Sequence, residues 1–391
     1  MRIGFFSETY LPLKYGVETS MVSFGTNLEK LGHEVYVYTS SMPRFKETNP
    51  HVFRLRSIGG PKTDMRFAVP IGQNGKLSDF IKNKLDVAHL HTNLTLGLLG
   101  KYIARREKIP TVYTHHNDYK GAIQAYLGKR SIIAYIVDKL AIWFANTSSA
   151  VIAPSEKMKE ILMRSGVKRP IYVLPTGVNL KHFEPTKESK NKAVAIRKQY
   201  HIPPTAKVLI SLSRIGKEKN VDFLVMALKE ILKKDENVRL MMVGGGPHLE
   251  GLKELVKKID LTDYVIFTGY VPEPDKPAYY QAADIYLYAS HHDTQAIVVL
   301  EAAASGLPIV TLEDGAFKDV VYDGKNGFSV SPDSLEIFAE KVLELMNNDS
   351  LRTKFAKNSR VIAENLSEEN QTKKLVAIYN DTIRNHESLT G

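Results

Sequence analysis

Short apolar runs alternate with helical patterns along the whole chain, and this alternation constrains the fold more than any other feature. Strands that alternate with helices are typical of βαβ units and of a parallel sheet. The predicted strands are 2–6, 35–39, 52–55, 87–91, 111–114, 150–153 and 171–174 in the first half, and 208–213, 239–243, 265–267, 285–288 and 307–311 in the second. Two such series predict an α/β protein with two Rossmann-like domains.

Turn residues interrupt the pattern between Pro175 and Pro185, and a lysine-rich stretch follows them. Clusters of turn residues between periodic segments are typical of connections. We therefore predict a first domain over residues 1–178 and a second over residues 179–366. A last helical pattern, 367–385, begins the remaining segment, 367–391.

Composition narrows the classes of protein that this chain can be. It has no cysteine, which excludes disulfides, zinc–thiolate sites and a cysteine nucleophile, and fits a reducing compartment. The N-terminus reads as a strand and not as a signal peptide, and no uncharged apolar run reaches the ~18 residues of a membrane span. Residues 1–200 carry a net charge of +16 and residues 201–391 a net of −6, within +10 overall. We expect a soluble or peripheral protein with an anionic partner: a membrane, a nucleic acid or an acidic polymer.

Two carboxylates, Asp293 and Glu301, lie eight residues apart around an apolar run. If that run is helical throughout, the rise of the helix separates them by about 12 Å. Carboxylate pairs that hydrolyse a glycosidic bond are only about 5 to 9.5 Å apart. The spacing therefore favours a long ligand that is held at two points, such as a sugar nucleotide.

Arg214 and Lys219 follow the predicted strand 208–213 and precede a helical pattern. Ligands of open parallel sheets bind at the carboxyl ends of the strands. Two cations there suit a diphosphate, although they could also be ordinary solvated surface charges beside Glu218.

Two glycine-containing loops also follow predicted strands. Gly16, in the loop before the helical pattern 18–31, allows backbone amides to approach a phosphate, but it also fits an ordinary turn. Gly245 lies in the Gly244–Pro247 turn, which indicates close helix–strand packing with some contact to a nucleotide. The turn lacks the full dinucleotide fingerprint and a P-loop lysine.

Histidines cluster at two predicted strand ends. His115 and His116 end the run 111–114, where a histidine can donate to a sugar hydroxyl or stabilise phosphate charge, or can be structural. His89 and His91 point the same way on a strand, but no third ligand lies at metal spacing, which favours buried histidines over a metal site. No Asp-x-Asp cation motif is present, so we expect no metal and no other cofactor.

The segment 128–144 is aliphatic and aromatic with basic flanks, and Lys101, Arg105, Arg106 and Lys108 lie nearby in the sequence. Such a helix can lie in a membrane interface, or it can be an ordinary core helix. Each cation near anionic lipid contributes about 1 kcal/mol of attraction.

Together, the segments around Asp293 and Glu301 and around Arg214 and Lys219 resemble the motifs of retaining glycosyltransferase family 4, which has the GT-B architecture of two Rossmann-like domains facing a central cleft. The family more often has Glu at position 293, Gly at position 213 and a second Gly at position 15. The resemblance covers nearly the whole chain. It implies a donor domain at 179–366, an acceptor-side domain at 1–178 and a C-terminal helix that crosses back to the first domain.

The resemblance also implies roles for single residues. Glu301 would bind the ribose, Arg214 and Lys219 would neutralise the leaving diphosphate, and His116 would contact the sugar or phosphate. Backbone groups near Tyr270 and Val271 would meet the base, although this segment also reads as a plain strand end. Asp293, helped by the backbone of the following residues, would hold the sugar hydroxyls; those residues are Thr294, Gln295, Ala296, Ile297 and Val298. Asp118 and Tyr119 resemble an acceptor-side pair.

Segments 114–119, 151–157 and 170–177 are most similar to bacterial 1,2-diacylglycerol 3-glucosyltransferases. The resemblance implies metal-independent, retaining transfer of a hexose, expected to be glucose, from a UDP-sugar to diacylglycerol by a cytoplasmic enzyme peripheral on the inner face of the membrane. Three alternatives stay open: a soluble or polyprenyl-linked acceptor, a sugar-nucleotide-binding protein without catalysis, and a nucleic-acid-binding protein. No aromatic-interleaved basic motif supports the last.

Overall fold

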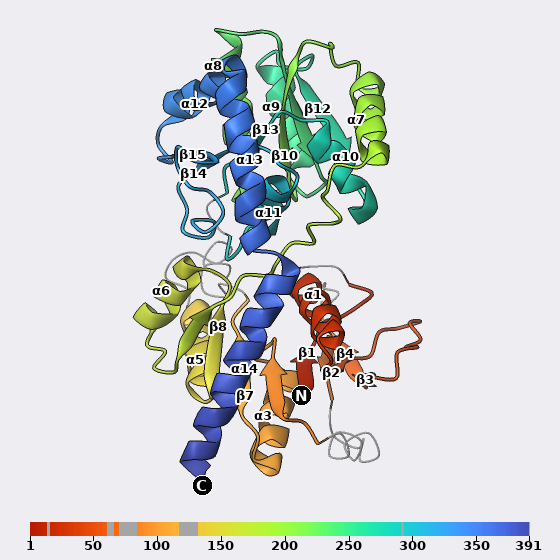
Figure 1. Ribbon diagram of the computed structural model, residues 1–391, viewed down its shortest axis with the longest axis vertical. Helices are drawn as coiled ribbons and strands as arrows, with labels where there is room; N and C mark the ends of the chain where they lie inside the picture. Colours follow the sequence, from red (N-terminus) through yellow and green to blue (C-terminus); the bar gives the residue numbers. More distant parts are fainter. Residues whose placement is uncertain (14–15, 61–65, 70–83, 117–131, 291–292, 391) are drawn as a thin grey trace. The chain divides into compact units, whose positions relative to one another are not determined.

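The computed structural model describes residues 1–390 except 14–15, 61–65, 70–83, 117–131 and 291–292, and the side chains of residues 133, 389 and 390 are also left out. The chain divides into two compact units (Figure 1). The N-terminal unit is Met1–Gly177 with Glu368–Gly391, and the C-terminal unit is Val178–Ser367. All but the first residue of the segment 367–391, which the sequence sets apart, is thus part of the first unit.

The N-terminal unit is built on a parallel seven-stranded sheet of order β3-β2-β1-β6-β7-β8-β9. Its strands are β1 (Arg2–Ser7), β2 (Glu34–Ser40), β3 (Val52–Leu55), β6 (Val87–Leu90), β7 (Thr111–Thr114), β8 (Ala150–Ala153) and β9 (Ile171–Val173), and its described helices are α1 (Gly16–Lys30), α3 (Thr95–Glu107), α5 (Ile132–Asn146), α6 (Glu156–Ser165) and α14 (Glu368–Thr390). A small antiparallel pair, β4 (Ser57–Gly59) and β5 (Arg66–Ala68), lies beside it.

Alternation along the strands supplies two cores, one on each face of this sheet. Val35 and Val37 point to one face, where α1 and α14 pack side by side, and Tyr36 and Tyr38 point to the other, where α3, α5 and α6 pack (Figure 1). A sheet that is covered on both faces explains why its strands read as continuous apolar runs.

The C-terminal unit has a parallel six-stranded sheet of order β12-β11-β10-β13-β14-β15. Its strands are β10 (Lys207–Leu212), β11 (Val238–Val243), β12 (Val265–Gly269), β13 (Ile285–Tyr288), β14 (Ile309–Leu312) and β15 (Gly327–Val330), and its helices are α7 (Lys187–Gln199), α8 (Val221–Leu232), α9 (Leu249–Lys258), α10 (Lys276–Gln281), α11 (Ile297–Ala304), α12 (Leu335–Asn347) and α13 (Asp349–Asn365), with short 3₁₀ turns η1 (Lys217–Lys219) and η2 (Glu273–Asp275). Apolar clusters fill both faces here too.

The predicted α/β class with parallel sheets is confirmed, and each predicted strand is present to within two residues at its ends. The sequence reading missed β15, because a glycine begins its short run, and it also missed the three-residue strands β4 and β5. In both sheets the strand order reverses beside the first strand of the unit, between β1 and β6 and between β10 and β13. A ligand of an open α/β sheet binds at such a switch point, at the carboxyl ends of the strands.

Candidate functional site

Lys219 and Asp293 meet at the switch point of the C-terminal unit. Lys219 lies in the connection after β10, and Asp293 lies in the connection after β13. The Lys219 ammonium is paired with Oδ1 of Asp293, and Tyr288 donates from its hydroxyl to Oδ2 at 2.6 Å. Nζ of Lys219 also lies 3.2 Å from the Tyr288 hydroxyl. The structure thus joins two of the predicted site residues through Tyr288, which the sequence reading missed.

This cluster is shielded from water. The side chains of Lys219 and Asp293 are only 19% and 11% exposed. Burial, reinforced by the negative charge of Asp293, holds the pKa of Tyr288 well above its usual value, so its hydroxyl stays a donor. Charges act more strongly on one another, and on a charged ligand, where water is excluded.

Arg214 has a different environment from Lys219. Its side chain is 57% exposed and is paired with Glu218, four residues on. A surface pair of this kind contributes less than about 1 kcal/mol to stability, so Arg214 can leave it for a stronger anion at low cost. The two cations are therefore not equivalent: one is fixed and buried, the other is exposed and loosely held.

Glu301 lies inside the protein on α11. Both of its carboxylate oxygens accept from Lys276, at 3.1 and 3.3 Å, and one accepts from the Tyr280 hydroxyl at 2.9 Å. Burial raises the pKa of Glu301, and the Lys276 charge opposes this rise. Lys276 and Tyr280 were missed by the sequence reading; their spacing of four on one helix after β12 was the available signal.

The assumption of a continuous helix between the two carboxylates is wrong. Helix α11 begins at Ile297, so residues 293–296 form a loop and the estimate of 12 Å from helical rise does not apply. Ala296 occupies the N-cap position and supplies no side-chain cap. Backbone amides of the first turn, including those of Ile297 and Val298, therefore face the end at which Thr294 and Gln295 lie, as a sugar or phosphate site needs.

The Gly244–Pro247 turn packs against the loop that carries Arg214. Gly244 has φ +137° and Gly246 has φ +158°, and a Cβ at either would lie 2.0 or 2.3 Å from the carbonyl oxygen of Ser213 or Ile215. The Ile215 amide donates to the carbonyl oxygen of Gly245. A Cβ at Gly245 itself would meet nothing within 4 Å among the described residues. The outer two glycines therefore allow close packing of this turn on the loop after β10, which differs from the predicted helix–strand packing, and Gly245 has room beside it.

Tyr270 and Val271 follow β12, as predicted, but differ in exposure. Tyr270 is 78% exposed, whereas Val271 is buried in the core. Both line a surface pocket of about 280 Å³ between α7 and α10, together with Pro272, Asp275 and Tyr279. The backbone at this strand end is thus open on one side.

The N-terminal unit has its own cluster at the switch point between β1 and β6. Glu8, directly after β1, is almost fully buried and accepts from the Leu96 amide at 2.6 Å, from the Thr95 hydroxyl at 3.1 Å and from the Thr92 hydroxyl. Burial raises the pKa of Glu8, and these hydrogen bonds oppose the rise. The carboxylate caps α3 and ties the loop after β1 to the loop after β6. The sequence reading missed Glu8, which a single acid after a strand does not reveal.

Three histidines stack beside this cluster. Nδ1 of His91 lies 3.1 Å from Nε2 of His116, and the rings of His89 and His91 are 4.1 Å apart. Both nitrogens of His89 are bonded, to the hydroxyls of Tyr379 and Thr114, each at 2.6 Å. Burial, followed by the neighbouring histidines, lowers the pKa of His89 and of His116 to about 3 and that of His91 well below its usual value, so all three are neutral at pH 7.

Several predicted features lie at the margin of what is described. Gly16 is the first residue of α1, while Tyr15, Asp118, Tyr119 and the beginning of the 128–144 segment lie outside the described residues. In the part of the chain that the structure describes, no cluster of histidine and carboxylate side chains could hold a metal ion. No helix there has the length and apolarity to cross a bilayer.

Two families of known sequences match this chain: "Glycosyltransferase Family 4" over residues 15–182 and "Glycosyl transferases group 1" over residues 193–361. The chain is 32% identical to the alpha-monoglucosyldiacylglycerol synthase of Acholeplasma laidlawii over 98% of both proteins. It is 35% identical to the Streptococcus pneumoniae enzyme of the same name, over 83% of this chain and 74% of that one. A GDP-mannose-dependent alpha-mannosyltransferase of Corynebacterium glutamicum is 26% identical, over 84% of this chain and 76% of that one.

Among solved structures, Anabaena Alr3699/HepE, determined in complex with UDP and glucose, superposes with a TM-score of 0.76 at 18% identity. The match covers 97% of this chain and 100% of that one. At this identity the likeness shows a common fold.

Proposed function

Since the chain belongs to glycosyltransferase family 4, with the GT-B fold, we propose that it transfers glucose from UDP-glucose to diacylglycerol, with retention of configuration and without a metal ion. The observation that carries the choice of glucose and of diacylglycerol is the similarity over 98% of both chains to an enzyme named for that product. The buried charges at the switch point of the C-terminal unit support the handling of a charged donor there.

The residues at that switch point have distinct tasks in this proposal. Lys219, already held by Asp293 in a water-poor site, stabilises the charge that develops on the leaving diphosphate. Arg214 exchanges its exposed partner Glu218 for a phosphate oxygen, which its planar fork binds well. These two cations take the part that a metal ion plays in other phosphate-transferring sites.

The carboxylates hold the two ends of the donor. Asp293, with the uncapped first turn of α11, accepts from the sugar hydroxyls, and Glu301 accepts from the ribose hydroxyls. The uracil ring lies against the backbone at Tyr270 and Val271, and the diphosphate passes Gly245, where space is open. The resemblance also assigns donor contacts to His116 and Gly16. In retaining transfer, an oxygen of the leaving group helps to deprotonate the acceptor hydroxyl.

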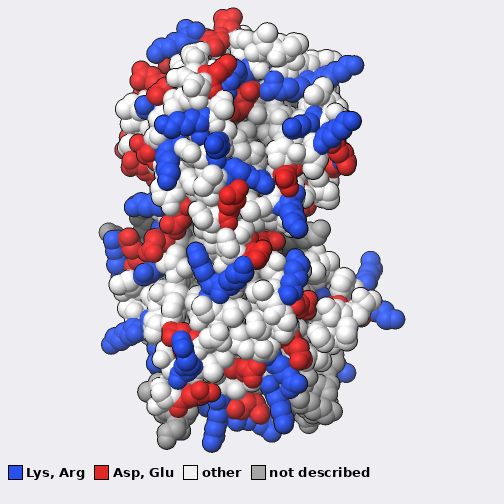
Figure 2. Space-filling model, in the orientation of Figure 1, with Lys and Arg blue, Asp and Glu red and all other residues white. Residues whose placement is uncertain are grey.

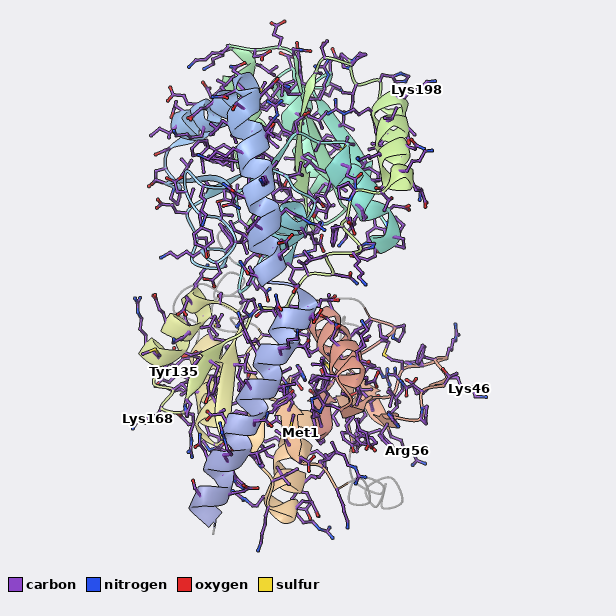
Figure 3. All side chains as sticks on the ribbon, in the orientation of Figure 1. Met1, Lys46, Arg56, Tyr135, Lys168 and Lys198 are labelled. Atoms are coloured by element: carbon purple, nitrogen blue, oxygen red, sulfur yellow. The ribbon has the colours of Figure 1, made fainter. Side chains whose placement is uncertain are left out.

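Helix α5 supports a membrane partner. Its exposed large apolar side chains, Ile132, Tyr135, Ile136, Leu140 and Trp143, recur at helical spacing, and all are more than half exposed. Leu98 and Tyr102 on α3 are exposed as well. Figure 3 labels Tyr135 on α5 and, on the same side of the unit, Lys168, whose amide donates to Asn146 at the end of that helix. The interpretation of 128–144 as a core helix therefore does not hold for this face of α5.

Lys101 contributes less to the positive field than its sequence position suggests. Its ammonium donates to the Phe144 carbonyl and to the Thr147 hydroxyl, both at 2.6 Å, and so ties α3 to the end of α5. Burial, followed by the charges of Arg169 and Arg105, lowers its pKa to about 7. In the view of Figure 2, basic and acidic side chains are mixed over both units, so the basic excess is not gathered on that face. We therefore expect the attraction to anionic lipid to come from Arg105, Arg106, Lys108 and Lys139.

The membrane contact is tested by sedimentation with vesicles of anionic and of zwitterionic lipid. Replacing Ile136 by Glu places a charge in the apolar face, and we expect binding to anionic vesicles to fall about tenfold or more, because burying that side chain contributes about 1.5–3 kcal/mol. Ile337→Glu is the matched control, since Ile337 is 49% exposed on α12 of the other unit. Equal binding by both variants would refute the assignment of this face.

The activity is tested by UDP release from UDP-glucose, with and without vesicles that contain diacylglycerol and anionic lipid. We expect release that depends on lipid and that is lost in Glu301→Ala, while Glu344→Ala, which removes an exposed carboxylate paired with Lys341, behaves as wild type. Release that ignores lipid would favour a soluble or polyprenyl-linked acceptor. Faster release from GDP-mannose would replace the donor, and donor binding without any turnover would indicate a binding protein.

A further inference from the structure

His91 is buried beside His116, yet one of its nitrogens has no partner. Only 2% of the residue is exposed, and Nε2 has no hydrogen-bond partner among the described residues. Its other nitrogen, Nδ1, lies 3.1 Å from Nε2 of His116, with the two rings stacked at 21°. A buried polar atom without a partner costs about 1–3 kcal/mol, so a side chain that carries one calls for an explanation.

The surroundings fix the position of the His91 ring. Its ring centroid lies 4.1 Å from that of His89 with the planes tilted by 31°, and it makes a T-shaped contact with Phe5 with ring centroids 4.8 Å apart. His89 is itself immobilised by Tyr379 and Thr114. His116 therefore meets a rigid partner that is anchored to β1, β6, β7 and α14.

The contact between the two rings also determines where their protons are. Both imidazoles are neutral at pH 7, so each has one N–H and one lone pair, and one ring must donate to the other. If His116 donated, the proton of His91 would be on Nε2, which would leave a buried N–H without an acceptor. If His91 donates from Nδ1, its Nε2 is only an unused lone pair. Unpaired buried N–H groups are rare, which favours donation by His91.

We propose that His91 is a positioning residue: it donates its Nδ1–H to Nε2 of His116 and thereby holds the His116 ring in one orientation with its proton on Nδ1. A neutral N–H held in place can stabilise negative charge on a sugar or phosphate oxygen without reorganisation during the reaction. This inference rests on the assignment of His116 to the transfer site in the proposed function. His91 itself touches no substrate in this account.

The contact can be tested without any activity measurement. In the full chain labelled with ¹⁵N histidine, two-bond ¹H–¹⁵N spectra report which nitrogen of each ring carries the proton. We expect the Nδ1–H form for His91 and His116, and a change in the Nε2 shift of His116 in His91→Phe. An Nε2–H form of His116 in the wild type would overturn the proposal.

Kinetics tests the consequence for transfer. We expect His91→Phe to lower kcat about tenfold, the effect of one lost hydrogen bond of about 1.4 kcal/mol, with an unchanged KM for UDP-glucose. His91→Asn should retain activity within about threefold, because its amide can donate from near the position of Nδ1. If the Phe variant does not fold, the activity of the Asn variant and the wild-type spectrum still test whether His91 donates to His116.

A double-mutant comparison separates positioning from a general structural effect. In a His116→Ala background, His91→Phe should cause no further loss of kcat, because the ring that it positions is gone. An equal loss in both backgrounds would overturn the proposal. If His116→Ala alone transfers glucose at the wild-type rate, the assigned role of His116 fails, while the tautomer spectra still report on the His91 contact.

Discussion

At the scale of single residues, the sequence indicated charged groups at the right strand ends but not their partners. Asp293 and Lys219 could be picked out because each lies in a connection after a strand, and Glu301 because it follows Asp293 by eight residues. Tyr288 gave no signal of its own, and the spacing of Lys276 and Tyr280 did not reveal their partner Glu301, because these contacts join separate connections. His91 was read as a buried strand-end histidine, which it is, but its contact with His116 depends on the pairing of β6 with β7.

The buried pair of Lys219 and Asp293 should be needed for turnover. Asp293→Asn keeps the shape but leaves the Lys219 ammonium without its carboxylate, so we expect kcat to fall about 100-fold, as for loss of a transition-state contact. Asp293→Glu, which restores the more usual acid of the family, should retain most of the activity. Steady-state kinetics checks both, with Asp349→Asn as the control, since that carboxylate is 81% exposed in a surface pair. Full activity in Asp293→Asn would contradict the assignment.

At the scale of elements, periodicity predicted the bounds of the strands well, but it did not predict the geometry of the loops and helix ends between them. The distance between Asp293 and Glu301 was estimated from helical rise over all eight residues, but helix α11 begins only at Ile297. The glycines of the turn after β11 differ in their surroundings: Gly244 and Gly246 pack closely against the loop after β10, whereas Gly245 has open space beside it. Sequence shows that glycines are adjacent; it does not show which of them another loop approaches.

We therefore expect substitutions at the adjacent positions Gly244 and Gly245 to differ in their effects on stability and on donor binding. Gly244→Ala forces a Cβ against the Ser213 carbonyl at a positive φ, so we expect the free energy of unfolding to drop by about 3 kcal/mol. Gly245→Ala meets open space and should leave the urea midpoint unchanged, while it weakens UDP-glucose binding, because the new methyl group occupies the path proposed for the diphosphate. Equal stability of the two variants would show that the turn does not pack as described.

At the scale of the whole molecule, alternating strands and helices suffice to predict two parallel sheets, and the order of motifs suffices for the family. The attachment of α14 to the first unit could be expected only from the resemblance. Its apolar residues Leu375, Ile378 and Tyr379 complete the core that α1 begins, and nothing in the local sequence tells which unit they cover.

The buried histidines make stability depend on pH. Because the pKa of His89 and of His116 is lowered to about 3 in the folded protein, the unfolded chain binds protons first as the pH falls below about 6.5. Their full contribution to stability is present above pH 6.5 and is lost progressively toward pH 3. Between pH 6.5 and pH 5 each should lower the free energy of unfolding by about 2 kcal/mol, which urea unfolding at the two pH values measures. His89→Asn should reduce this pH dependence by one histidine's share, and His201→Asn, at an exposed position, should not.

The anomeric configuration of the product is the most direct test of the proposed retaining transfer of glucose to diacylglycerol. Purified protein, UDP-glucose and vesicles that contain diacylglycerol should yield a glucolipid, whose anomeric proton identifies the linkage by NMR. We predict α-linked glucose on the free hydroxyl of diacylglycerol, formed in the presence of a chelator. A β-linked product, or UDP release without any glucolipid, would contradict it.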